Sequence, residues 1–205
     1  IGSFIADEQD PEKVFKLFKD KGIFNFSFIV IPHLGLLKLD GLKVEIQKNI
    51  SVKKIEGLKI PFYIGISNLN SGKIEYHNEG PIDLLVLASS SIPVLFSPVE
   101  YKKQIYVDGG LIKNIPVDPL KNICEKIIAV NINPLQEIND LENLSGIAAR
   151  TFQLSVNSNI KGIEEECDLY IEPTELAKFD ILNTKSADET FQIGYEYTKK
   201  MSMDI

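Results

Sequence analysis

One carboxylate in the sequence stands where it could act as a base. Asp108 follows the short apolar run Ile105-Tyr106-Val107 and precedes Gly109 and Gly110. A strand that ends in this way delivers a carboxylate into a tight turn, because glycine accepts backbone conformations that other residues resist. An aspartate held there can take a proton from a nearby hydroxyl group and make it nucleophilic. The competing interpretation is an ordinary Asp-Gly-Gly turn, since such turns are common.

The residues around Asp108 favour a catalytic interpretation. Between Ala88 and Val117 the sequence reads Ser-x-Ile-Pro-x-x-Phe-x-Pro-Val, then Val-Asp-Gly-Gly, then Asn-x-Pro-Val. This order and spacing resemble the patatin-like phospholipase family. The segments Leu58–Gly72 and Asp168–Pro173 agree more loosely, the latter with the tail of small bacterial members. The resemblance thus covers nearly the whole chain.

The resemblance implies a patatin-like serine acyl hydrolase with a Ser–Asp dyad, in which Asp108 is the base and Gly109 and Gly110 shape its turn. The family's serine lies in a Gly-x-Ser-x-Gly elbow between a strand and a helix, where the hydroxyl is exposed and a backbone N–H can bind an oxyanion. Ile1-Gly2-Ser3 resembles the end of that elbow, with Gly2 as its closing glycine. We therefore expect the nucleophile immediately before Ile1, and the first strand and oxyanion loop upstream of it.

Other residues offer alternatives that the sequence leaves open. Ser89, Ser90 and Ser91 are rival nucleophiles, but they precede Pro93 without a glycine elbow, so we interpret them as packing residues. Ser3 is interpreted as a residue of the first helical turn. The apolar stretch Phe24–Leu37, which includes His33, is core or else part of an acyl-chain channel or lid.

Short apolar runs alternate with helical patterns along the chain. This alternation predicts an α/β domain of three layers, with a mainly parallel central sheet and helices on both faces, spanning residues 1–205 as a single domain. Asp10 and Ser186 are predicted N-caps, the latter with Glu189 in a capping box. The predicted helices are 2–6, 11–19, 42–50, 81–90, 147–161 and 186–201. The predicted strands are 60–67, 73–77, 105–107, the buried run 126–132, and 169–171.

Composition limits the classes of partner. The net charge of −7 argues against nucleic acid as a partner, and 44% hydrophobic with 25% charged residues is ordinary for a soluble globular protein.

The cysteines and histidines predict no metal site. Cys124 and Cys167 lack a paired spacing and are expected to be buried free thiols. His33 and His77 lie far apart in the sequence, so no metal site is expected. No cofactor is implied. We expect a cytoplasmic protein, compatible with transient contact with a membrane surface.

The expected activity is hydrolysis of lipid acyl esters, of phospholipase, lysophospholipase or esterase type. Two other functions remain open. The chain could be a non-catalytic lipid- or partner-binding module on the same fold, or an acyltransferase that passes the acyl group to an acceptor other than water. The residues before Ile1 distinguish the binding module from the enzymes.

Overall fold

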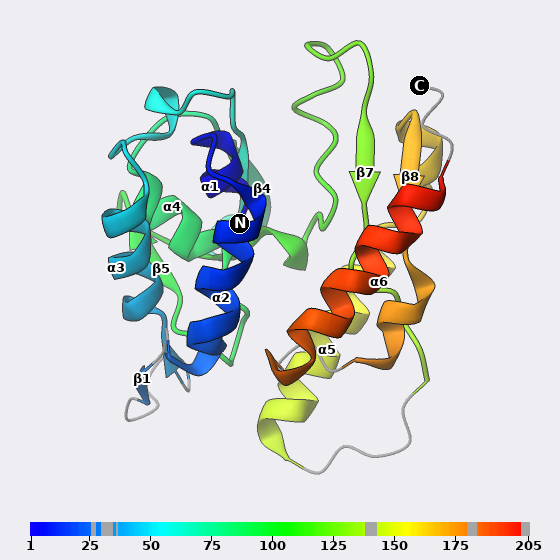
Figure 1. Cartoon of the computed structure of the whole chain (residues 1–205). Coiled ribbons are helices and arrows are strands. Elements are labelled where there is room, and N and C mark those ends of the chain that lie inside the picture. Colours follow the sequence, from blue (N-terminus) through cyan, green and yellow to red (C-terminus); the bar gives the residue numbers. More distant parts are fainter. Residues whose placement is uncertain (26–27, 30–34, 36, 138–142, 180–183, 202–205) are drawn as a thin grey trace. The chain divides into compact units, whose positions relative to one another are not determined.

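The computed structural model describes residues 1–25, 28–29, 35, 37–137, 143–179 and 184–201. The chain divides into two compact units, residues 1–112 and residues 113–205, each of which is described by itself (Figure 1). His33 and the centre of the Phe24–Leu37 stretch, for which a channel or lid was an alternative, lie outside the described residues. The single-domain organisation stays a prediction.

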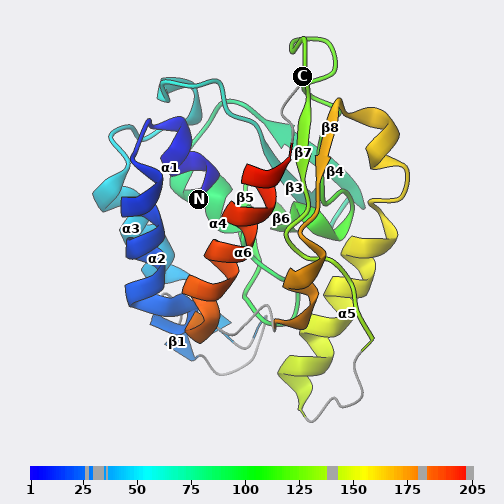
Figure 2. The ribbon, with the colours of Figure 1, turned by 45° about the vertical axis from the view of Figure 1, so that its right-hand side comes forward.

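The described residues of the first unit form four helices, a four-stranded sheet and a short strand pair. Figures 1 and 2 show how these elements are arranged. Its helices are α1 (Gly2–Ala6), α2 (Pro11–Asn25), α3 (Asp40–Asn49) and α4 (Ile82–Ser89), with 3₁₀ turns η1 (Ile55–Gly57) and η2 (Gly109–Leu111). Its strands are β1 (Phe28–Ile29), β2 (Leu37–Lys38), β3 (Ile64–Asn68), β4 (Lys73–His77), β5 (Val99–Tyr101) and β6 (Gln104–Asp108).

The four-stranded sheet has the order β4-β3-β6-β5, and every neighbouring pair in it is antiparallel. Two of these pairs are hairpins, which are antiparallel because a short turn reverses the chain. The β5–β6 turn consists of Lys102 and Lys103, both with positive φ (48° and 62°). The central pair joins distant segments and places Ile66 of β3 opposite Asp108 of β6. Strand pairing therefore fixes the end of β6 within the sheet.

Helix α4 packs on this sheet and against α3. The helix is mostly apolar, and Leu85 on α4 and Ile66 on β3 are both fully buried. Asp10 caps the start of α2, as predicted, by accepting a hydrogen bond from the Lys13 N–H at 3.0 Å. The packing of α4 therefore supports the sheet that carries Asp108.

Residues 113–137, 143–179 and 184–201 of the second unit form two helices and a parallel strand pair. Its elements are β7 (Ile128–Val130), α5 (Leu144–Ser158), η3 (Ile163–Glu166), β8 (Leu169–Ile171), η4 (Thr174–Lys178), η5 (Thr184–Ser186) and α6 (Ala187–Lys200). A separate core forms around the described side chains Ile115, Val117, Ile127, Ala129 and Ile163. Asn143 caps α5 by accepting a hydrogen bond from Gly146 N–H at 2.8 Å.

The α/β class is confirmed, with part of the sheet structure antiparallel. Among the described strands the parallel arrangement appears at β7–β8, whereas β3 to β6 are antiparallel. The run 126–132 is not buried throughout, because alternate side chains of a strand point to opposite faces. Ala129 is buried, but Ile128 and Val130 are about half exposed, at 49% and 50%.

Two local predictions differ from the structure. The strand expected from Ile60 begins at Ile64, because the Ile60 N–H instead bonds the Ala6 carbonyl of α1 at 3.0 Å. The capping box at Ser186 does not form: Ser186 ends η5 with nearly helical backbone angles and makes no side-chain cap. Glu189, its expected partner, instead accepts from Lys178 at 3.2 Å.

Candidate active site

Asp108 is the last residue of β6 and begins the 3₁₀ turn η2. Its backbone N–H donates to the Ser91 carbonyl at 3.0 Å, and its carboxylate Oδ1 accepts from the Gly110 N–H at 2.8 Å. The backbone of the turn therefore holds the Asp108 side chain in place. One carboxylate oxygen has a fixed donor.

The environment of Asp108 favours the protonated form of its side chain. The side chain is half-buried, and burial raises the pKa of its carboxyl from 3.8 to about 6, although the Gly110 N–H bond acts in the opposite direction. A carboxylate with a pKa near neutrality accepts a proton more readily than an ordinary surface aspartate. Asp108 is thus a stronger base than its residue type suggests, and it is still largely ionised at pH 7.

Gly109 lies where no other side chain would fit. A Cβ atom built on it would be 2.4 Å from the Gly65 carbonyl oxygen and 2.6 Å from the Gly65 carbonyl carbon, closer than real Cβ contacts. Both Gly109 and Gly110 are buried. The close approach of β3 to the turn after Asp108 therefore requires glycine at position 109.

Sequence reasoning missed two residues that hold this turn. Gly65 supplies the backbone against which Gly109 packs, and the fully buried Ser67 hydroxyl donates to the Gly109 carbonyl at 3.3 Å. Both lie on β3, about forty residues before the turn, and the sequence carries no local signal of the β3–β6 pairing that brings them there.

The rival serines make contacts suited to packing. The hydroxyl of Ser91, which is buried, donates to the Leu87 carbonyl at 2.8 Å, and that of Ser90 donates to the Val86 carbonyl at 2.9 Å. Such bonds back onto the preceding helical turn are common for serine. Ser91 instead contributes its carbonyl oxygen to the backbone of Asp108.

Gly2 and Ser3 begin helix α1, where the sequence placed them. A Cβ atom on Gly2 would lie 3.0 Å from Cε2 of Phe62. Ser3 is 2% exposed, and its hydroxyl has no hydrogen-bond partner within the described part of the chain. Ser3 is therefore a buried residue in the first turn of α1, as the sequence predicted.

His77 and the two cysteines lie apart from Asp108 in the sequence and form no recognised site among the residues that the structure describes. His77 lies 3.3 Å from the Glu75 carboxylate. Cys124 is exposed and Cys167 half-buried, so the prediction of buried thiols is wrong; Cys124 lies in the polar run Lys121–Lys126, which packs few of its side chains. No group of three or more His, Cys, Asp or Glu residues within the described ranges is arranged to hold a metal ion.

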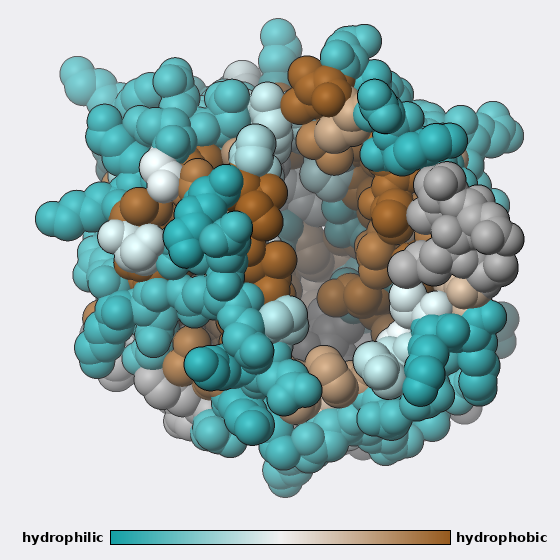
Figure 3. Space-filling view, turned by 45° about the horizontal axis from the view of Figure 1, so that its top comes forward, coloured by the Kyte–Doolittle hydropathy of each residue, from teal (hydrophilic) through white to brown (hydrophobic). Residues whose placement is uncertain are grey.

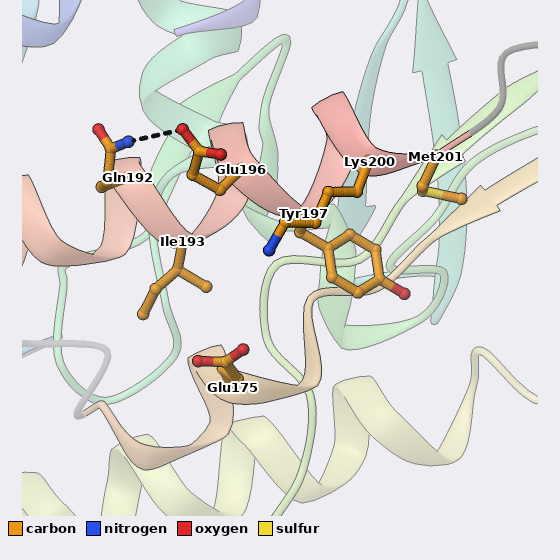
Figure 4. A pocket seen from close by; sticks show the side chains of 7 residues that line it. All are labelled: Glu175, Gln192, Ile193, Glu196, Tyr197, Lys200 and Met201. Atoms are coloured by element: carbon orange, nitrogen blue, oxygen red, sulfur yellow. Dashed lines mark hydrogen bonds between the residues drawn. The ribbon is translucent and has the colours of Figure 1, made fainter.

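A groove of about 530 Å³ lies in the second unit between α6 and η4. Ile193 on α6 and Glu175 on η4 face its interior (Figure 4). Gln192 donates to Glu196 at 3.0 Å along its rim. The groove contains none of the site residues predicted from the sequence. Its lining combines charged, polar and apolar side chains and indicates no particular ligand.

None of the helices that the structure describes combines the length and apolar character needed to cross a bilayer.

Comparison with known proteins supports the resemblance seen in the sequence. Lysophospholipase nte1 of Emericella nidulans is 26% identical over 181 residues, which cover 75% of this chain and 12% of that protein. The corresponding protein of Aspergillus niger is 27% identical over 180 residues. An uncharacterized NTE family protein of Mycobacterium tuberculosis is 28% identical over 104 residues, half of this chain. The chain therefore spans about an eighth of the length of the fungal relatives.

The family model for patatin-like phospholipases matches residues 1–121, which include the whole first unit, the start of α1 and the turn after Asp108. This match covers more than half of the chain. The chain belongs to the patatin-like phospholipase family.

Proposed function

We propose that the protein hydrolyses acyl esters of lipids with a Ser–Asp dyad in which Asp108 is the base. The observation that carries the proposal is the state of the Asp108 carboxylate. It ends a strand at a glycine turn, one of its oxygens is held by Gly110 N–H, and burial raises its pKa to about 6. A side chain in this state suits proton transfer near neutral pH.

The relatives support the class of substrate. The fungal proteins are named lysophospholipases, and the family is one of phospholipases. Both descriptions point to an acyl ester of a lipid. We propose the same substrate class for this chain, reached by transient contact with a membrane surface and without a metal or cofactor.

The proposed nucleophile is a serine at the position immediately before Ile1, with Gly2 closing its elbow. Asp108 takes the serine proton while the serine oxygen attacks the ester carbonyl. The alcohol then leaves with that proton and an acyl-enzyme remains. In the second half, Asp108 takes a proton from water, whose oxygen attacks the acyl group, and the serine leaves with a proton as the fatty acid is released.

The first test is N-terminal peptide sequencing of the native protein. Gly-x-Ser directly before Ile1 would support the proposed nucleophile. Any other residue immediately before Ile1 would contradict the proposed dyad and would favour a binding role for the same fold.

The second test replaces the base. We expect D108N to lower kcat for p-nitrophenyl butyrate by at least about a thousandfold, because an amide cannot accept the serine proton. The matched control is D118N, which changes an exposed aspartate of a surface ion-pair network and should leave kcat within twofold. Full activity of D108N would rule out Asp108 as the base.

Product analysis with an added alcohol distinguishes a hydrolase from a transferase. Transfer of the acyl group to the added alcohol rather than to water would identify a transferase.

A further inference from the structure

Val94 has a backbone conformation that its side chain disfavours. Its φ is 69°, in the left-handed region, which a β-branched residue rarely adopts. Its side chain is 54% exposed, so burial of the side chain does not compensate for the strain. Strained residues of this kind occur where a functional requirement fixes the backbone.

The segment around Val94 is fixed on both sides. The Phe96 N–H bonds the Ile92 carbonyl across Val94 at 2.9 Å, and the Leu95 carbonyl accepts from the Leu37 N–H at 2.9 Å. Leu95 and Phe96, which follow Val94, are each 2% exposed. The loop is thus anchored by its other residues, while the Val94 side chain is exposed and that of neighbouring Pro93 is half-buried.

The same segment is tied to the proposed base. Ser91, three residues before Val94, accepts the backbone N–H of Asp108 through its carbonyl at 3.0 Å. Three residues of chain reach at most about 11 Å, so Val94 stays within about one acyl-chain length of the Asp108 backbone. An exposed apolar side chain that lies within this distance of the proposed base is suited to contact the acyl chain.

We propose that Val94 is a specificity-determining residue that contacts the acyl chain of the substrate and favours long chains over short ones. The inference rests on the proposed function. It extends that function by assigning a residue to the recognition of the substrate's acyl chain. The Ser–Asp dyad does not by itself explain how chain length is recognised.

The test compares hydrolysis of p-nitrophenyl laurate and p-nitrophenyl butyrate by the native protein and by V94T. Threonine has the shape and branching of valine, so this change alters mainly the polarity of the exposed side chain. We expect the laurate-to-butyrate ratio of kcat/KM to fall about fivefold, since a contact with one or two methylene groups is lost. V94I, which stays apolar, should keep the ratio within twofold.

The matched control is V44T. Val44 lies on α3, is 43% exposed and has no unusual φ, so V44T makes the same chemical change on another part of the surface. It should leave the ratio unchanged. V94N provides an independent measure of strain, because asparagine tolerates the left-handed region: its Tm should rise by about 2–4 °C while the ratio falls as in V94T.

The outcomes separate the two proposals. If D108N abolishes hydrolysis while V94T keeps the native ratio, the role of Val94 is overturned and the proposed function stands. If V94T and V44T lower the ratio equally, the effect is not specific to position 94 and the proposal is also overturned. If D108N retains full hydrolysis, the proposed function fails and the inference about Val94 fails with it.

Discussion

Burial of the Asp108 carboxyl makes two measurable properties of the protein depend on pH. The first is activity. Because the pKa of Asp108 is raised to about 6, kcat/KM should increase as pH rises through about 6 and then level off as the base becomes fully ionised. A profile that stays flat from pH 5 to pH 8 would show that another group limits the rate.

The second property is stability. Between about pH 4 and pH 6 the folded protein binds the Asp108 proton more tightly than the unfolded chain does, so the free energy of unfolding falls as pH rises through this range. Each tenfold change in proton affinity is worth about 1.4 kcal/mol. The shift of the Asp108 pKa from 3.8 to about 6 therefore lowers the free energy of unfolding at pH 7 by roughly 3 kcal/mol, relative to its value at low pH. Because asparagine carries no charge at either pH, D108N should have a free energy of unfolding higher than that of the native protein by on the order of 2 kcal/mol at pH 7 and by almost nothing at pH 4. Urea unfolding of both proteins at both pH values measures this difference. An equal gain at both would refute the electrostatic explanation.

The turn after Asp108 requires glycine at position 109. G109A would place a methyl group 2.4 Å from the Gly65 carbonyl oxygen, so β3 and the turn must separate. We expect a loss of about 3 kcal/mol or more in the free energy of unfolding and a loss of activity. The control is G194A on α6, where nothing lies within 4 Å of the added Cβ and stability should rise by about 1 kcal/mol. Equal stability of G109A and the native protein would contradict the close approach.

At the scale of the element, a polar network crosses three strands of the sheet. Glu75 on β4 accepts from Asn68 on β3 at 2.7 Å and from the Tyr106 hydroxyl on β6 at 3.0 Å. Although burial alone would raise the pKa of Glu75, the bonds from Asn68, Tyr106 and His77 lower it. Tyr106 faces the same side of β6 as Asp108, because residues two apart in a strand share a face.

This network should help to hold β6 in register. Y106F keeps the buried ring and removes only the hydroxyl, so we expect a loss of about 1–2 kcal/mol in unfolding free energy and a fall in kcat larger than any change in KM. The control is Y195F, because Tyr195 on α6 is 53% exposed. If Y106F and Y195F behave alike, the bond to Glu75 does not support the strand.

The sequence predicted local elements well where their signals are local. Asp10 before Pro11 predicted the start of α2, and Lys73–His77 was predicted residue for residue as β4. The antiparallel β3–β6 pairing was not predicted, because alternating strands and helices suggested parallel neighbours and nothing near Asp108 indicates Gly65 or Ser67. The strain at Val94 was also not predicted, because its positive φ accompanies a hydrogen bond from the Phe96 N–H to the Ile92 carbonyl that the sequence does not reveal.

At the scale of the whole molecule, charge and apolar exposure bear on how the protein meets lipid. The chain carries a net charge of −7, while apolar side chains reach the surface among hydrophilic ones (Figure 3). An acidic protein gains little from an anionic membrane, because like charges repel. Contact with lipid should therefore depend on apolar side chains.

Vesicle sedimentation tests this expectation. We expect no more protein to bind phosphatidylcholine vesicles that contain phosphatidylserine than vesicles of phosphatidylcholine alone, and we expect binding to persist at high salt. Salt-sensitive binding that increases with phosphatidylserine would show that a local basic surface outweighs the net charge.

The pairing of Ile66 with Asp108 has a consequence for the order of folding. These residues are 42 positions apart in the chain, 108 minus 66, whereas the β3–β4 and β5–β6 hairpins are closed by short turns. Local hairpins lose little chain entropy when they close, but the β3–β6 contact must first close a long loop. We therefore expect a partly folded molecule to form its hairpins before it joins them, so that the carboxylate of Asp108 takes its place only when the two halves of the sheet meet.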